Sequence, residues 1–248
     1  MVAQVRRSLP GKTRVGHAGT LDPFATGLLL VLVGRATRVQ RFLMALPKRY
    51  EATARFGAVS STGDPEGKIV VTGAVPEGPL SLPHGRLRQR PPAYSAVKIG
   101  GRRAYQLARA GHEVRTAERE VEVYRFEERW HQGARRGFSI ECSAGTYVRS
   151  LIADLGDAYC EQLRRSAIGD FDVGNADPQR PIALAAALSF LPEVPLDPEQ
   201  ARKATHGAQV SSGRATAPMV RLTDDHGLIA LAEPGPRPGT VKPVVGFR

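Results

Sequence analysis

The chain has 248 residues, of which 42% are hydrophobic and 24% are charged, close to the average of soluble globular proteins. This composition excludes a disordered chain, a collagen and a membrane bundle, because the longest apolar run, Leu28 to Val33, is far shorter than a span of about 20 residues. The net charge is +11, and 29 of the 35 cationic side chains are Arg. Since Arg binds phosphate through two parallel hydrogen bonds, the charge predicts a nucleic acid partner; the alternative is a genome that prefers Arg codons.

The cysteine pattern bears on the cellular compartment. Cys142 and Cys160 form no Cys-x-x-Cys pair, so neither a disulfide scaffold nor a Cys-ligated zinc site is expected. No apolar stretch follows the basic N-terminus, so a secretory signal is not visible. We therefore expect a cytoplasmic protein without a membrane partner.

The first half of the chain predicts strands joined by long loops. The apolar run 27–33 lies between glycines and predicts a buried strand. Residues 50–57 and 67–75 predict further strands, whereas the Pro-, Gly- and Arg-rich range 76–92 predicts an exposed loop. Residues 102–110 predict a short helix that ends at a glycine.

The middle of the chain carries the clearest periodic patterns. Residues 119–126 predict a strand, and the strict apolar–polar alternation over 138–142 predicts a half-buried strand. Apolar residues at positions 148, 151, 152 and 155 predict a helix with one buried face.

The last quarter of the chain predicts short elements. Residues 181–191 predict an Ala- and Leu-rich helix with Pro in its first turn, and 192–195 predict a linker. Asp197 is expected to cap a helix that reaches residue 206, and 208–248 predict short strands and turns.

These elements predict an α/β (α+β) fold. We expect a mixed, mostly antiparallel central sheet with flanking helices and a basic cleft, followed by a small β module. The expected domains are residues 1–192, large enough for catalysis, and residues 193–248.

The segment from Gly16 to Gly27 holds the densest group of candidate functional residues. Asp22 precedes Pro23, and the commonest use of an Asp-Pro pair is a turn or a cap, with catalysis as the alternative. His17 is a base, a metal ligand or an ordinary loop histidine. No second His lies at ligand spacing, so no metal site is expected.

Several blocks of the sequence resemble motifs of the TruB family of transfer-RNA pseudouridine synthases. The resemblance covers residues 2–172, and the blocks keep the order that they have in the family. They are GHAGTLDPFATGLLLVLVGRATR from Gly16 (the aspartate motif), KRYEA from Lys48 through Gly57 (the tyrosine motif), RPPAYSAVK from Arg90, GTYVRSLIADLG from Gly145 (the arginine motif) and LRR from Leu163 through Gly169.

The resemblance implies an isomerase that makes pseudouridine at position 55 in the T-loop of transfer RNA. Such an enzyme breaks the C1′–N1 bond and joins C1′ to C5 of the same base, without a metal or cofactor. Asp22 is then the catalytic carboxylate; it attacks the sugar, attacks the base or abstracts a proton, and the sequence leaves all three routes open. Arg149 is the implied cation beside it, whereas without the motif a surface arginine on a helix is the better interpretation.

Further residues are implied to surround a base that has left its stack. Tyr50 stacks on the uracil near C5, and Tyr147 and Leu163 form walls of the pocket. By pattern alone, Tyr50 is equally well a core aromatic on a strand, and Tyr147 and Leu163 are ordinary core residues. His17 fills the gap left by the flipped base. Lys98 contacts phosphate, although a solvated charged face is the ordinary interpretation of its surroundings.

The C-terminal stretch resembles, more weakly, the PUA-like module of the same family, which binds RNA or serves as a structural cap. We expect the T-arm of transfer RNA as partner, no obligatory protein partner, and a monomer. Two alternatives stay open: the archaeal and eukaryotic relative that is guided by a small RNA, and a non-catalytic RNA-binding protein.

Overall fold

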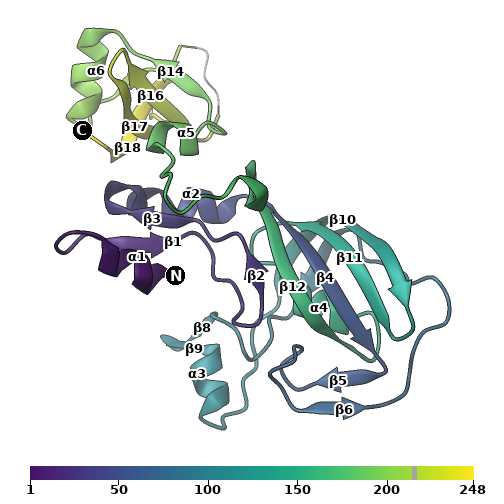
Figure 1. The fold of residues 1–248 in the computed structure, drawn as a ribbon. Helices are drawn as coiled ribbons and strands as arrows, with labels where there is room; N and C mark the ends of the chain where they lie inside the picture. The colour runs from purple at the N-terminus through teal and green to yellow at the C-terminus, as the bar shows by residue number, and fades with distance from the viewer. Residues whose placement is uncertain (214–216) are drawn as a thin grey trace. The chain divides into compact units, whose positions relative to one another are not determined.

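The computed structural model describes residues 1–213 and 217–248 (Figure 1). They form two compact units: unit 1 contains residues 1–16, 32–40 and 177–248, and unit 2 contains residues 17–31 and 41–176. Each unit combines segments that are distant in the sequence, whereas the predicted domains are continuous. The division into domains at residue 192 therefore stays a prediction. Within the described ranges, no helix is both long enough and apolar enough to cross a membrane.

Unit 2 is built on a seven-stranded sheet in the order β13-β12-β4-β11-β10-β7, with β2 beside β12. Only the pairing of β2 with β12 is parallel, which confirms a mixed, mostly antiparallel central sheet. The strands are β2 (Thr26–Gly27), β4 (Lys48–Phe56), β7 (Gly85–Gln89), β10 (Arg119–Gln132), β11 (Arg135–Cys142), β12 (Ala158–Ile168) and β13 (Phe171–Asp172).

The core of unit 2 lies between this sheet and helix α4 (Val148–Ala153), which packs against β12 (Figure 1). The three residues of 138–142 that were predicted to point inward are all buried, so that prediction is confirmed. Leu151 and Ile152 of α4 belong to the same core cluster. The rings of Phe126 and Phe138 meet edge to face, 5.3 Å apart. Alternation in the strands and the apolar face of α4 therefore produce one core.

Smaller elements surround the sheet. Two short ribbons, β5–β6 and β8–β9, lie in the connections that follow β4 and β7. The chain passes between the units through a third ribbon, β1–β3, and through α2. The bounds are β1 (Val15–His17), β3 (Val31–Val33), α2 (Gln40–Ala45), β5 (Ala58–Ser60), β6 (Ile69–Val71), β8 (Lys98–Ile99), β9 (Arg102–Arg103), α3 (Ala104–Arg109) and η2 (Val173–Asn175).

The prediction of a single strand over 27–33 is wrong. Strand β2 ends at Gly27, and β3 begins only at Val31. Gly27 has φ +101°, a conformation that residues with a side chain rarely adopt, and the Leu28 N–H donates to the Arg165 carbonyl at 2.8 Å. The chain therefore leaves β12 here, and an apolar run alone does not reveal that turn.

The predicted loop over 76–92 contains strand β7. Its backbone pairs with β10 from Gly85 opposite Val123 to Gln89 opposite Arg119. Tertiary pairing overrides the weak strand preference of Gly- and Arg-rich sequence at this edge. The helix predicted at 102–110 is present as α3, after the short strand β9.

Unit 1 contains a five-stranded sheet in the order β14-β16-β17-β18-β15, so the C-terminal module is mostly β as predicted. The predicted cap is also confirmed, since the Asp197 carboxylate accepts the Gln200 N–H at 2.8 Å. The bounds are α1 (Val2–Ser8), η1 (Gly34–Val39), α5 (Leu184–Ala187), β14 (Glu193–Pro195), α6 (Pro198–Thr205), β15 (Val210–Ser211), β16 (Val220–Asp224), β17 (Gly227–Pro234) and β18 (Thr240–Gly246).

Two predictions in this unit are wrong. The helix expected over 181–191 is reduced to α5, because Leu188 and Ser189 close tight turns rather than continue it. The expected linker 192–195 forms β14, which runs parallel to β16 and buries Val194 in the core of the module.

Candidate active site

Asp22 lies in the loop between β1 and β2. Its backbone behaves as an Asp-Pro pair usually does, since its carbonyl accepts the Ala25 N–H at 3.0 Å and closes a turn. Its carboxylate does not cap that turn. Instead, the side chain reaches Arg149 on α4, which leaves the carboxylate available for a second role.

Arg149 holds the Asp22 carboxylate with two parallel hydrogen bonds. Nε donates to Oδ2 at 2.8 Å, and Nη2 donates to Oδ1 at 2.9 Å. The Arg149 side chain is 2% exposed, whereas that of Asp22 is 26% exposed. Two charge-assisted bonds fix both the position and the plane of the carboxylate. The guanidinium also stabilises its negative charge, while one edge stays open to an approaching molecule.

Arg149 itself cannot swing away, because its other N–H groups are also bonded. Nη1 donates to the Thr62 carbonyl at 2.8 Å and to Asp64 Oδ2 at 3.1 Å. Nη2 also donates to the Tyr94 carbonyl at 2.9 Å. The planar guanidinium thus joins four chain segments at one point, which preorganises the site.

Asp64 is a site residue that the sequence analysis missed. It is buried, and its Oδ1 accepts the Thr62 hydroxyl at 2.5 Å and the Glu66 N–H at 3.1 Å. Two carboxylates, those of Asp22 and Asp64, therefore share one guanidinium. The only signal in the sequence was a second Asp-Pro pair, Asp64-Pro65, in a segment that otherwise indicates an exposed turn.

Tyr50 lies on β4 between Ile140 of β11 and Arg165 of β12, and it packs against the core. Burial raises the pKa of its hydroxyl to about 12, with the Asp22 charge acting in the same direction; the charge and hydrogen bond of Arg165 act against this rise. The hydroxyl therefore keeps its proton at neutral pH. The role of Tyr50 in base binding stays a prediction.

Tyr147 and Leu163 come from two different elements of unit 2. Tyr147 precedes α4, and its backbone N–H and carbonyl both bond to the Gln89 amide, at 2.7 and 3.0 Å. The Arg119 guanidinium lies 5.3 Å from the centre of the Tyr147 ring. Leu163 is opposite Ala52 in the sheet and belongs to the core. Their roles as pocket walls stay predictions.

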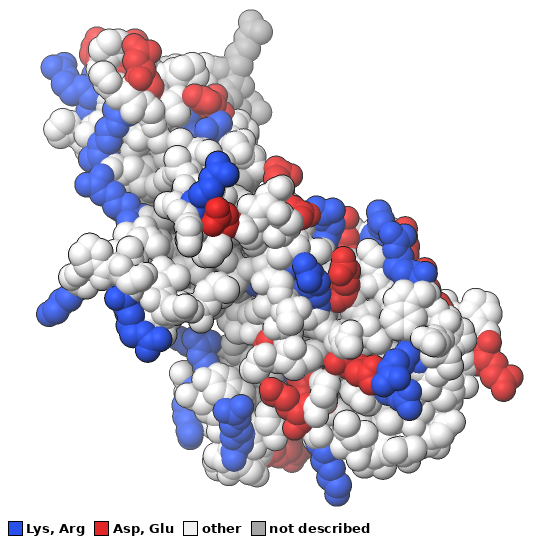
Figure 2. Space-filling view, viewed as in Figure 1, with Lys and Arg blue, Asp and Glu red and all other residues white. Residues whose placement is uncertain are grey.

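His17 and Lys98 are the two remaining residues that the sequence predicted to contact RNA. His17 is the last residue of β1, and the next residue, Ala18, donates its N–H to the Leu30 carbonyl at 2.9 Å. Lys98 is on the exposed ribbon β8–β9, opposite Arg103. Figure 2 shows Lys and Arg side chains standing over the segment of β8, β9 and α3. That exposed position fits either phosphate contact or a solvated face.

Two further features concern metal ligands and surface charge. No group of three or more His, Cys, Asp or Glu side chains among the described residues is arranged to hold a metal ion. A hollow of about 630 Å³ is lined by acidic and basic side chains together, among them Glu51, Glu161, Arg129 and Arg164. Both signs of charge are visible side by side over the sheet in Figure 2. The predicted basic cleft is therefore not this hollow, and it stays a prediction.

Residues 6–148 match the model of the TruB family pseudouridylate synthase N-terminal domain. The tRNA pseudouridine synthase B of Thermobifida fusca (strain YX) is 39% identical, with 100% of this chain and 93% of that protein covered. The protein of the same name from Mycobacterium sp. (strain KMS) is 37% identical, with 93% and 86% covered. A chain in the crystal structure of a Cbf5-Nop10-Gar1 complex has a similar fold, with a TM-score of 0.68, 23% identity, and 99% of this chain and 79% of that chain covered.

Proposed function

Because this chain belongs to the TruB family of pseudouridylate synthases, we propose that it converts the uridine at position 55 in the T-loop of transfer RNA to pseudouridine. The protein is thus an isomerase: the C1′–N1 bond breaks, and C1′ joins C5 of the same base. The observation that carries the assignment of the site is the double hydrogen bond from Arg149 to the Asp22 carboxylate.

Asp22 is the proposed catalytic carboxylate. Its position suits that role, because the carboxylate is fixed in its plane by Arg149 and yet remains 26% exposed. A uridine inside folded RNA must leave its stack to reach such a group. Attack on the sugar, attack on the base and abstraction of a sugar proton are all compatible with one oriented carboxylate.

Tyr50 is proposed to bind the displaced uracil and to assist the departure of the C5 proton. Since its hydroxyl is protonated at neutral pH, Tyr50 would take part in the proton transfer as a neutral, hydrogen-bonded phenol and not as a phenolate anion. Tyr147 and Leu163 are the proposed walls of the pocket, with His17 filling the gap in the RNA stack. Lys98 is proposed to contact phosphate.

No metal or cofactor is proposed, since the isomerisation changes neither the atoms nor the oxidation state of the nucleoside. The proposed partner is the T-arm of transfer RNA, bound by a cytoplasmic monomer without an obligatory protein partner. The PUA-like C-terminal module is proposed to extend the RNA contact.

The experiment that tests the function measures tritium release from a transfer RNA transcript that carries uridine labelled at C5. We expect stoichiometric release with the full chain, and none with a transcript whose position 55 is cytidine. The alternative of a non-catalytic RNA-binding protein predicts tight binding to both transcripts without any release. Release from a uridine outside the T-loop would contradict the proposed substrate position.

A further inference from the structure

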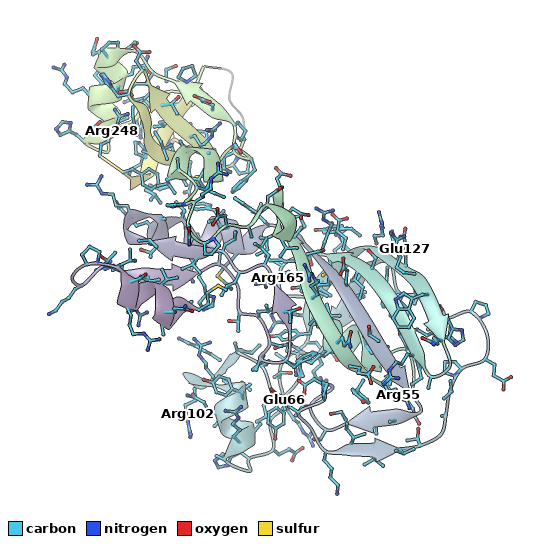
Figure 3. All side chains as sticks on the ribbon, viewed as in Figure 1. Arg55, Glu66, Arg102, Glu127, Arg165 and Arg248 are labelled. Carbon is cyan, nitrogen blue, oxygen red and sulfur yellow. The ribbon has the colours of Figure 1, made fainter. Side chains whose placement is uncertain are left out.

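Arg165 is a buried cation that the resemblance assigned no role. It lies on β12 beside β2, and its side chain is labelled in Figure 3. Only 1% of the residue is exposed. Opposite it on β4 is Tyr50. Arg165 is therefore located between the strand that carries Tyr50 and the loop that carries Asp22.

The Arg165 side chain binds that loop at both ends. Nε donates to the Leu28 carbonyl at 2.8 Å, while Nη1 and Nη2 donate to the carbonyls of Thr20 and Gly19, each at 3.3 Å. Asp22 lies between these anchor points. The Arg165 backbone adds a fourth contact, because its carbonyl accepts the Leu28 N–H at 2.8 Å.

The loop also approaches the backbone of β12 closely at Arg165. A Cβ atom added at Gly27 would lie 2.3 Å from the Arg165 carbonyl oxygen, so only glycine permits the approach. Arg165 is also the cross-strand neighbour of Tyr50, and its charge partly offsets the effect of burial on the Tyr50 pKa. Arg165 thus binds the loop that carries Asp22 and lies beside the strand that carries Tyr50.

Arg165 makes its contacts without a carboxylate partner among the described residues, unlike Arg149 and Arg136, which are also buried. Burial of an unpaired charge costs several kcal/mol, and an apolar side chain would serve packing alone at a lower cost. Three backbone carbonyls offset that cost only when the loop is in this one conformation. The arginine and the loop conformation therefore depend on each other.

We propose that Arg165 is a positioning residue for the isomerisation, which fixes the Asp22 loop relative to Tyr50. The inference deepens the proposed function and rests on it. Arg165 acts through the backbone of the loop rather than on the RNA. It therefore governs the rate of the chemical step more than the affinity for substrate.

The test replaces Arg165 with Lys in the full chain. Lys keeps the charge, but its single ammonium group cannot reach three carbonyls that are arranged for a planar fork. The matched control is Arg136→Lys, since Arg136 is 2% exposed in the same sheet and binds Glu128 and the Pro76 carbonyl instead. Melting temperature, hydrogen exchange, and kcat and KM for tritium release are measured on both variants.

We expect Arg165→Lys to lower kcat at least tenfold, with KM within threefold of wild type, and to accelerate exchange of the Leu28 amide. Arg136→Lys should lower the melting temperature without changing kcat or that exchange rate. Normal kcat in folded Arg165→Lys, or equal loss of kcat in both variants, would overturn the proposal. If the wild-type chain releases no tritium, the proposed function fails first; that outcome is read from wild type alone.

Discussion

Arg149 and Asp64 form a buried ion pair, with 3.1 Å between Nη1 and Oδ2, and with side chains that are 2% and 6% exposed. The pair turns Arg149 from a mobile partner of Asp22 into a fixed one. Removal of the Asp64 charge leaves Arg149 paired with Asp22 alone, and loss of a charged hydrogen-bond partner typically costs about 1.5–3 kcal/mol.

Asp64→Asn is therefore expected to lower the free energy of unfolding by about 1.5–3 kcal/mol. Urea denaturation measures this change. The control is Glu127→Gln, whose carboxylate pairs with Arg125 and Arg129 at the surface and should cost less than about 1 kcal/mol. Equal losses in the two variants would contradict the structural role of Asp64.

Asp22→Asn is expected to abolish turnover while the protein stays folded and binds RNA. The amide keeps the size of the side chain but removes its charge and nucleophilicity. Loss of a negative charge near phosphate should leave the affinity for RNA unchanged or higher. Single-turnover tritium release and a filter-binding assay provide the two readouts. Turnover within tenfold of wild type would remove Asp22 from the catalytic role.

Salt is expected to weaken RNA binding steeply. For about four phosphate contacts, the affinity should fall roughly 50- to 150-fold between 50 and 200 mM salt, by the counterion-release relation. Fluorescence anisotropy with a T-arm stem-loop gives the slope. An affinity that does not change over this range would mean that the charge of +11 reflects composition alone.

Tyr50→Phe and Tyr50→Ala separate the hydroxyl from the ring. Phe keeps stacking, which is worth about 1–3 kcal/mol per base, so it should slow turnover with little loss of RNA binding. Ala should be slower still and bind a T-arm stem-loop less tightly. Single-turnover rates and melting temperatures are measured on both. If Ala only destabilises the fold, by about 3–5 kcal/mol, and its folded fraction turns over normally, Tyr50 is a core residue.

The raised pKa of Tyr50 predicts a loss of stability at high pH. The ordinary pKa is 10.0, and the folded value is about 12. The unfolded chain therefore loses this proton first, so the contribution of Tyr50 to stability is complete below pH 10 and is lost as pH rises to about 12. Two units correspond to about 3 kcal/mol.

The measurement compares the free energy of unfolding of wild type and Tyr50→Phe at pH 9 and pH 11.5. Wild type should lose more stability than the variant over this interval. Lys48 and Cys142, whose pKa values are shifted to about 8 and about 11, also titrate there, but they are common to both proteins and cancel in the difference. Parallel losses would show that Tyr50 ionises as freely as a surface tyrosine.

Local sequence was sufficient to predict those features that depend on residues close together in the chain. Alternation over 138–142 predicted which side chains are buried in β11, and Asp197 predicted the start of α6. The motif around Asp22 and the arginine motif indicated the family, which the comparisons support independently. In each case, the information lies within a few residues of the feature.

Tertiary structure decided which charged residues are buried. Asp64 and Arg149 are 85 positions apart in the chain, and no local pattern marks either one as buried. Arg164 and Arg165 are consecutive and chemically identical, yet the first is exposed and the second is buried. Their difference follows from the register of β12, which places Leu163 opposite Ala52 and Arg165 opposite Tyr50. Since side chains alternate between the faces of a strand, a shift of one residue would exchange the two arginines, and only pairing with distant strands sets that register.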